Sequence, residues 1–272
     1  MAIDLSKAVA CVTGGGRGIG AATARALAKR GAQVVIGDID LECAQVVAEE
    51  IGPQAMAVAL DVADTESFEA FLAAARTRGP VTLLVNNAGI QRTGEFISQP
   101  LSMQWREIAI NLGGVINGMR LVLPEMLAEG CGHIVNVASM AGKMTVPGAA
   151  VYSASKFGVA SLSRAVRSEI AASPVTLTTI LPAAVETDLI AGLDTRGVPT
   201  VTPDAVARAI VASCRHGRPE VTLPRWLTPF AAIEQVIPER FGERIKHAVG
   251  AQQRLSTEDQ AARQYQARTS RS

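Results

Sequence analysis

A tyrosine and a lysine four residues apart are the side chains in this sequence best suited to acid–base chemistry. Tyr152 and Lys156 stand in a stretch with helical spacing, so they share one face of the helix. A free tyrosine has a pKa of about 10 and exchanges protons poorly at neutral pH. A neighbouring ammonium favours the phenolate and lowers that pKa, so Tyr152 could exchange a proton with a substrate oxygen. Ser139, just after a predicted strand, could hydrogen-bond the same oxygen.

A glycine-rich segment, TGGGRGIG at Thr13–Gly20, has the composition of a phosphate-binding turn. It lies between a predicted strand and a predicted helix, where glycines let the backbone approach a diphosphate and the first helical N–H groups attract negative charge. A glycine cluster alone is weak support because many turns are glycine-rich, but this placement favours dinucleotide binding. Beside such a site, a catalytic Tyr152–Lys156 pair is favoured over the alternative, two side chains on a solvated helix face.

Apolar runs that alternate with amphipathic segments must position these residues. Strands are expected at 8–13, 33–37, 55–60, 81–85, 133–138, 175–181 and 220–223. Helices are expected at 18–30, 41–51, 65–78, 102–129, 152–172 and 203–215. The last helix has Thr202 as its N-cap and Pro203 at its first position. Strict alternation with continuously apolar strands predicts an α/β fold, a doubly wound parallel sheet of about seven strands with helices on both faces.

The composition is that of a globular protein. Hydrophobic residues make up 48% of the 272 residues and charged residues 19%, which excludes a disordered chain. A formal net charge of +1 argues against a nucleic-acid-binding protein that relies on phosphate contacts. The N-terminus lacks the layout of a signal peptide, and no apolar run reaches the ~18–20 residues of a membrane-spanning helix, so a cytoplasmic protein is expected.

Cysteine and histidine usage indicates no metal site. The four cysteines lie far apart, without a CxxC pair or a nearby histidine: Cys11, Cys43, Cys131 and Cys214. Neither a zinc site nor a disulfide framework is therefore expected, and the thiols should be reduced and mostly buried. The histidines have no catalytic partner pattern, and His133 is expected only to open a strand.

Taken together, the motifs resemble those of the short-chain dehydrogenase/reductase family. The matching pieces occur in the family's order and at its usual separations: Thr13–Gly20, Asn86–Gly89, Asn111, Ser139 and Tyr152–Lys156. The resemblance covers about residues 5–225 and implies a single Rossmann-type catalytic domain, expected at 1–225. It further implies nicotinamide-dependent chemistry on alcohols and carbonyls, and a homo-oligomer, either a homotetramer or a homodimer.

The resemblance also implies the roles of site residues. The catalytic set would be Asn111, Ser139, Tyr152 and Lys156. Asn111 would hold a water that links Lys156 to solvent as a proton relay; a satisfied buried amide is the alternative. The cofactor contacts would be Gly14, Gly16, Arg17, Gly18, Ile19, Gly20, Asp38, Asp61, Val62, Asn87, Ala88, Gly89, Tyr152, Lys156, Pro182, Val185 and Thr187.

For two of these cofactor contacts another interpretation stands beside the implied one. Asp61, expected to contact adenine, could be an ordinary loop aspartate, and Asn87 could serve a purely structural turn. The family usually has glycine after Pro182, whereas this sequence has Ala183. An alanine there would be strained if the position requires a positive φ.

Asp38, at the end of the second predicted strand, indicates NAD as the cofactor. Its carboxylate can accept hydrogen bonds from both ribose hydroxyls and would repel a 2′-phosphate. Arg17 could attract such a phosphate, but Ile39, which follows Asp38, is not basic. NAD is therefore favoured over NADP.

The expected substrate walls are apolar. They are Gln91–Ile97, Met140–Ala149 and Leu189–Val198, with Ile90, Met140, Met144, Val146, Leu189, Ile190 and Leu193 as apolar lining. No arginine cluster awaits a carboxylate or phosphate, and the nearby cations are expected to be solvated loop charges: Arg92, Lys143 and Arg196. A small apolar secondary alcohol or its ketone, steroid-like or lipid-like, fits such walls best.

Residues 226–250 form an expected helical extension beyond the family core, and 251–272 a polar, flexible tail. An apolar stripe runs through the extension from Trp226 to Val249. We expect it to pack on its own domain or on a neighbouring subunit. A membrane surface, with Trp226 and Phe230 among lipids, is the less favoured alternative.

The sequence thus predicts an NAD-dependent oxidoreductase that interconverts a secondary alcohol and a ketone, with Tyr152 as the acid–base. Two alternatives stay open. One is an NADPH-dependent ketoacyl or carbonyl reductase, against which Asp38 argues. The other is a non-catalytic dinucleotide-sensing protein, against which the intact Ser139, Tyr152 and Lys156 argue.

Overall fold

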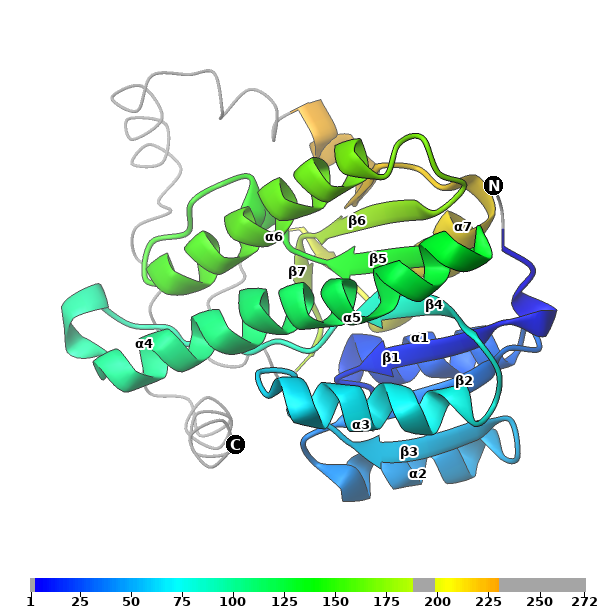
Figure 1. Ribbon diagram of the computed structural model, residues 1–272. Helices are drawn as coiled ribbons and strands as arrows, with labels where there is room; N and C mark the ends of the chain where they lie inside the picture. Colours follow the sequence, from blue (N-terminus) through cyan, green and yellow to red (C-terminus); the bar gives the residue numbers. More distant parts are fainter. Residues whose placement is uncertain (1–2, 188–198, 230–272) are drawn as a thin grey trace.

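A single parallel sheet organises the chain in the computed structural model, which describes residues 3–187 and 199–229. Its strand order is β3-β2-β1-β4-β5-β6-β9, and every neighbouring pair is parallel (Figure 1). The strands are β1 (Val9–Thr13), β2 (Gln33–Asp38), β3 (Ala55–Ala59), β4 (Val81–Asn86), β5 (His133–Val137), β6 (Thr176–Pro182) and β9 (Glu220–Leu223). A separate parallel pair consists of β7 (Ala184–Val185) and β8 (Thr200–Val201). The predicted doubly wound sheet is confirmed.

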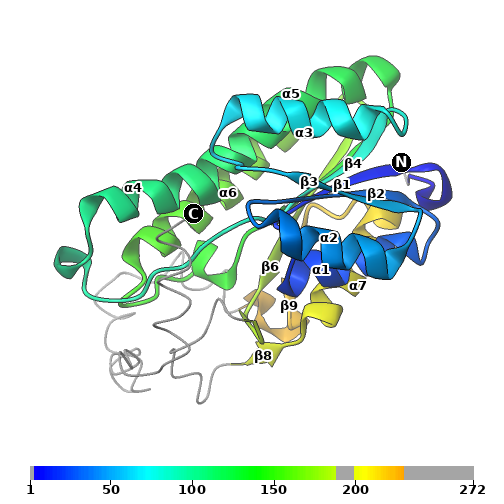
Figure 2. The ribbon, with the colours of Figure 1, turned by 90° about the horizontal axis from the view of Figure 1, so that it is seen from below.

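Helices cover both faces of this sheet. They are α1 (Gly18–Ala28), α2 (Leu41–Ile51), α3 (Thr65–Arg76), α4 (Leu101–Ile108), α5 (Gly114–Glu129), α6 (Ala150–Glu169) and α7 (Pro203–His216). Figures 1 and 2 show α3, α5 and α6 on one face and α1, α2 and α7 on the other. Right-handed crossovers between parallel strands require such a layer on each side.

The core consists of two apolar clusters, one on each face of the sheet. Along β1, Val9 and Cys11 join the cluster under α3, α5 and α6, whereas Ala10 and Val12 join the cluster under α1, α2 and α7. Because side chains of a strand alternate between the two faces, a strand buried on both sides must be apolar at every position. The continuous apolar runs of the sequence have this cause.

The predicted helix over 102–129 is interrupted. α4 and α5 are joined by a π-helical turn, η3 (Ala109–Gly113), so the uninterrupted helix was a wrong expectation. A π-helical turn accommodates one extra residue per turn and commonly occurs at functional positions. Asn111 lies inside this turn, and its side chain is directed into the fold rather than to solvent.

The thiols are less buried than expected. Cys11 and Cys214 are buried, but Cys43 is partly exposed and Cys131 is exposed. Cys43 lies in the first turn of α2, at the edge of the sheet, and Cys131 follows Gly130, which ends α5 in a left-handed conformation. Both stand at element ends, where the chain comes to the surface.

Part of the expected substrate wall and most of the C-terminal extension lie outside the described residues, at 188–198 and 230–272. The beginning of the extension is described: Trp226 is exposed and Leu227 packs against the core. Among residues 3–187 and 199–229, no helix is both long enough and apolar enough to span a membrane.

His133 opens β5, as expected, and is completely buried. Its Nδ1 lies 2.8 Å from Thr176 Oγ1 of β6, and its Nε2 lies 3.0 Å from Ser213 Oγ of α7. Two hydroxyl partners suit a neutral imidazole, which donates one hydrogen bond and accepts another. Burial lowers the pKa of His133 to about 4.

We therefore expect the free energy of unfolding to depend on His133 below about pH 6.5, the ordinary pKa of histidine. Between that pH and about 4, the unfolded chain binds a proton that the folded chain does not, so stability falls as the pH falls. The expected slope is about 1.4 kcal/mol per pH unit. Denaturant unfolding of wild type and His133→Gln from pH 4.5 to 7.5 measures it. The difference in unfolding free energy between wild type and His133→Gln should shrink toward low pH. A constant difference would contradict the prediction.

Candidate active site

The glycine loop between β1 and α1 packs closely against the chain that leaves β4. Gly14 has φ +62°, and a Cβ there would lie 2.8 Å from the Cα of Ala88. A Cβ on Gly20 would lie 2.1 Å from the carbonyl oxygen of Gly14. Only glycine fits either position, because a side chain would force apart the backbone segments that form the turn.

Two polar side chains tie this loop to β4. Thr13 Oγ1 accepts hydrogen bonds from the N–H groups of Asn87 and Ala88, each at 3.0 Å. In return, Asn87 Nδ2 donates to the carbonyl oxygens of Thr13 and Gly14, at 2.9 and 3.0 Å. The structural interpretation of Asn87 is therefore supported, and its side chain also lies at the wall of the cleft described next.

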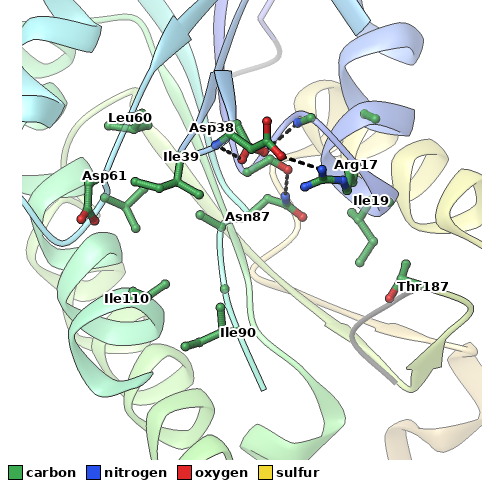
Figure 3. Close-up of a pocket in the computed structure, with 18 of the residues that line it drawn as sticks. Arg17, Ile19, Asp38, Ile39, Leu60, Asp61, Asn87, Ile90, Ile110 and Thr187 are labelled. Carbon is green, nitrogen blue, oxygen red and sulfur yellow. Dashed lines mark hydrogen bonds and ion pairs between the residues drawn. The ribbon is translucent and has the colours of Figure 1, made fainter. Parts of the chain in front are cut away.

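A cleft of about 1130 Å³ opens at the carboxyl ends of the strands (Figure 3). In doubly wound folds this edge is where ligands bind. Twelve of the residues predicted to contact a cofactor line it: Gly14, Gly16, Arg17, Gly18, Ile19, Asp38, Asp61, Val62, Asn87, Ala88, Gly89 and Thr187. Gly20, Tyr152, Lys156, Pro182 and Val185 do not line it.

Several residues of the lining were not among the predicted cofactor contacts, including Ile39, Leu60 and Ile110. Figure 3 shows them at the end of the cleft where Asp61 lies, with Ile19 and Thr187 at the other end. Ile39 and Leu60 each follow directly on a strand that ends at this edge, a position that could have predicted them. Arg106 also belongs to the lining, and its Nη2 lies 3.6 Å from Asp61 Oδ2.

Asp38 is held by backbone N–H groups on both sides. Its Oδ2 accepts from Gly16 N at 2.8 Å, and its Oδ1 accepts from Asp40 N at 3.0 Å. This carboxylate therefore fixes the glycine loop as well as lining the cleft. Each carboxylate oxygen has a further lone pair, which leaves Asp38 able to accept bonds from a ligand.

Arg17 is engaged by the start of α2. Its Nη2 lies 2.6 Å from Asp40 Oδ2 and 2.6 Å from Cys43 Sγ. The hydrogen bond from Arg17 lowers the pKa of the Asp40 carboxyl below its ordinary value. A guanidinium paired in this way must leave its partner before it can bind another anion.

Tyr152 and Lys156 project from the first turns of α6, which begins at Ala150, two residues earlier than predicted. Both are buried, and Lys156 Nζ lies 5.7 Å from the centre of the Tyr152 ring. Lys156 Nζ donates to the carbonyl oxygen of Val137 at 3.1 Å. Burial lowers the pKa of Lys156 to about 8.

Ser139 follows β5 and caps the short 3₁₀ turn η4 (Met140–Gly142), and its Oγ accepts from Ala141 N at 3.0 Å. The turn packs directly on α6, since a Cβ on Gly142 would lie 2.5 Å from the carbonyl oxygen of Lys156. The turn that Ser139 caps thus lies against the helix that carries Tyr152 and Lys156, and a shared role of the three side chains stays a prediction.

Both polar atoms of the Asn111 side-chain amide are hydrogen-bonded. Its Oδ1 accepts from Ile90 N at 2.8 Å, and its Nδ2 donates to Ile90 O at 2.8 Å and to Ser155 Oγ at 3.1 Å. The side chain therefore matches the alternative interpretation, a satisfied buried amide, while a role in holding water stays a prediction. Gly89 lies between the cleft and this group: a Cβ there would stand 3.0 Å from Asn111 Oδ1 and 3.4 Å from Lys156 Nζ.

A profile of the short chain dehydrogenase family matches residues 8–196. The chain belongs to this family. The probable oxidoreductase EphD of Mycobacterium tuberculosis is 35% identical over 253 residues, which cover 84% of this chain and 43% of EphD. The chain thus spans less than half the length of that relative. LinX of Sphingobium indicum, a 2,5-dichloro-2,5-cyclohexadiene-1,4-diol dehydrogenase, is 36% identical over 197 residues, which cover 71% of this chain and 79% of LinX.

Solved structures agree with this membership. A 3-ketoacyl-(acyl-carrier-protein) reductase from Brucella melitensis, crystallised with NADH, superimposes with a TM-score of 0.70 at 32% sequence identity. The match covers 75% of this chain and 89% of the reductase.

Ala183 is not strained, because in the described part of the chain only glycines have a positive φ, so the condition for strain is not met. One expectation about this short-chain dehydrogenase is wrong. Lys143 is not a solvated loop charge: it is buried, and its Nζ lies 3.0 Å from Glu220 Oε2 of β9. The ion pair ties the loop after η4 to the edge strand, a contact that sequence spacing cannot reveal.

The remaining predicted cofactor residues lie around β6. Pro182 ends β6 and pairs with Leu223 of β9, and Val185 is buried in β7. Thr187 N donates to Val185 O at 2.7 Å, which folds the chain back so that Thr187 reaches the cleft.

The bonds of Thr13 predict how strongly the glycine loop depends on this hydroxyl. Thr13→Val keeps the shape of the side chain and leaves two N–H donors without their acceptor, so we expect a loss of about 1–3 kcal/mol in the free energy of unfolding. Thr23→Val is the matched control: its Oγ1 is equally buried and has no hydrogen-bond partner among residues 3–187 and 199–229. Urea unfolding of both variants should show a loss for Thr13 and little change for Thr23. Equal losses would contradict the prediction.

Proposed function

We propose that this short-chain dehydrogenase is an NAD-dependent oxidoreductase that interconverts a secondary alcohol and its ketone on an apolar substrate. The observation that carries the proposal is the buried Tyr152–Lys156 pair, which lies directly behind Gly89 at the wall of the cleft. Lys156 thus lies behind the wall of the cleft that the glycine loop also lines.

The chain's own residues supply the proton chemistry in this proposal. Tyr152 exchanges a proton with the substrate oxygen, and the Lys156 ammonium favours the phenolate form of Tyr152. Ser139 donates a hydrogen bond to the same oxygen and orients it. When bound, the nicotinamide supplies the hydride acceptor or donor.

The cleft suits a dinucleotide by its shape and its chemistry. The glycine loop offers backbone N–H groups at the start of α1, where a diphosphate would bind. Asp38 would accept from the ribose hydroxyls, and Asp61 and Val62 would contact the adenine. Thr187 would hold the nicotinamide end.

Two features support NAD over NADP. Asp38 is fixed in the cleft by two N–H groups, so that its charge would meet a 2′-phosphate directly. Arg17, which could offset that charge, is already paired with Asp40.

Four apolar residues of the expected substrate wall lie in the described part of the chain. Ile90 and Met140 are buried, Met144 packs against the core, and Val146 is exposed. The buried pairing of Lys143 with Glu220 removes one expected cation from this wall, which further supports an apolar alcohol or ketone. LinX, whose name is that of a diol dehydrogenase, is a precedent for an alcohol substrate.

Tyr152→Phe tests the acid–base role. The substitution keeps the buried ring and removes the hydroxyl, so we expect NAD affinity to change little and kcat to fall ~10²-fold or more, the scale of lost general acid–base catalysis. Steady-state oxidation of a panel of cyclic and long-chain secondary alcohols measures it, with cofactor titration as the control for folding. Turnover within a few-fold of wild type would rule out Tyr152 as the acid–base. If wild type binds NAD or NADP but turns over no alcohol or ketone, the dinucleotide-sensing alternative is favoured.

Asp38→Ala tests the cofactor preference. Charge-assisted hydrogen bonds contribute ~1.5–3 kcal/mol each, so we expect wild type to prefer NAD over NADP by at least ~10²-fold in kcat/KM. The variant should have a lower kcat/KM with NAD and a higher kcat/KM with NADP than wild type. Asp38→Asn, which keeps an acceptor for Gly16 N, separates loss of charge from loosening of the loop. A wild-type preference for NADP, or equal preferences in wild type and Asp38→Ala, would contradict the assignment.

A further inference from the structure

Glu107 is a buried carboxyl group that the proposed chemistry does not use. It lies on α4, four residues before Asn111, and its side chain is completely buried. Its Oε1 accepts a hydrogen bond from Arg92 N at 3.0 Å. Its Oε2 is buried and has no hydrogen-bond donor among residues 3–187 and 199–229. A buried carboxylate is costly unless another charge compensates it.

The same helical stretch presents Glu107 and Asn111 to one extended segment. Asn111 bonds both backbone groups of Ile90, and Glu107 bonds the N–H of Arg92, two residues further on. This segment follows Gly89, where a Cβ would lie 3.0 Å from Asn111 Oδ1 and 3.4 Å from Lys156 Nζ. Glu107 therefore holds the segment that passes between Asn111 and Lys156 on one side and the cleft on the other.

Helices α4 and α6 lie side by side at this point (Figures 1 and 2). Asn111 Nδ2 donates to Ser155 Oγ, the hydroxyl next to Lys156 in the chain. Asn111 of η3 thus contacts the turn of α6 that carries Lys156, and Glu107 lies about one helical turn before Asn111.

Lys156 needs a compensating charge in this environment. It is buried, and its one described hydrogen bond is to the carbonyl oxygen of Val137. Burial lowers its pKa to about 8, and the charge of Glu107 opposes that effect. Burial likewise raises the pKa of Glu107 to about 7, opposed by the N–H of Arg92 and by the charges of Arg92 and Lys156. The carboxylate thus forms in the pH range just below that in which Lys156 loses its proton.

The charged and titratable groups that act on Glu107 and Lys156 come from two elements. Arg92 acts on Glu107 from the connection between β4 and α4, and Lys156 acts on it from α6. Tyr152, one turn before Lys156 on α6, is the titratable neighbour of the ammonium.

We propose that Glu107 is a positioning residue, the buried counter-charge that keeps Lys156 in its ammonium form beside Tyr152. It touches neither substrate nor cofactor and acts through Lys156. The inference rests on the proposed function only in that the ammonium is what makes Tyr152 an effective acid–base. No covalent step and no net proton transfer involves Glu107.

Glu107→Gln is the variant of choice, because its amide oxygen can still accept from Arg92 N while the charge is removed. We expect the pKa of Lys156 to fall by about one unit. NMR titration of protein labelled with ¹³C at lysine Cε measures this pKa, and the Lys156→Met variant assigns the Lys156 signal. The pH profile of kcat should shift with it. Above the new pKa, kcat should be about tenfold below wild type, and well below that pKa it should be within threefold. KM and NAD affinity should stay within threefold.

Two variants sharpen this test. Glu107→Asp retains the charge one methylene further away and should give an intermediate pKa of Lys156. Glu129→Gln removes an exposed carboxylate from α5 and should leave the profile unchanged. If Glu107→Gln does not fold, Glu107→Asp alone decides the question by the same titration. An unchanged Lys156 titration, or an equal loss of kcat at every pH, would overturn the proposal. The lysine titration needs no substrate, so a missing turnover in wild type would overturn the proposed function while the titration still decides the role of Glu107.

Discussion

The contact between the glycine loop and the end of β4 is the constraint on which the site depends. β1 and β4 are neighbours in the sheet, so the chains that leave them must pass one another at its carboxyl edge. They pass with Gly14 against Ala88 and with Gly20 against Asn87, at separations that admit no side chain. This close approach starts α1 at the edge of the cleft, which its first residues line. Thr13 and Asn87 hold the two chains together by four hydrogen bonds between them.

From that contact a chain of polar side chains leads to the buried acid–base pair. The segment after Asn87 passes Gly89 and is held at Ile90 by Asn111 and at Arg92 by Glu107. Asn111 lies in a π-helical turn, where the regular α-helical hydrogen-bond pattern is interrupted. Its side-chain amide bonds the backbone of Ile90 in the neighbouring segment. Such bonds from helix to loop place the wall of the cleft at a defined distance from α6. A merely apolar packing of the loop would leave that distance less well determined.

Two of the buried titratable groups, His133 and Lys156, have opposite surroundings. His133 lies between Thr176 and Ser213, two hydroxyl groups that satisfy a neutral ring, so burial keeps it uncharged and structural. Lys156 has a single carbonyl partner, and it lies beside an aromatic ring and within the field of Glu107. Since a buried ammonium is unfavourable without compensation, its surroundings are what determine whether it stays charged at neutral pH. The difference between the two sites lies in the neighbours that tertiary packing supplies.

The sequence by itself determined the fold class, because strands buried on both faces must be apolar throughout and helices must alternate with them. It also determined the family, through motifs whose residue types are required by backbone geometry or by proton chemistry: the glycines of the loop, and Tyr152 with Lys156 one helical turn apart. Only the tertiary structure decided how charged side chains are paired. Lys143 with Glu220 and Arg17 with Asp40 join residues 77 and 23 positions apart in the sequence. No local periodicity encodes such pairs, because they arise where separate crossovers bring distant segments to the same edge of the sheet. The π-helical turn at Asn111 has the same origin, since the bonds that accompany it come from Ile90 and Ser155, outside the helix.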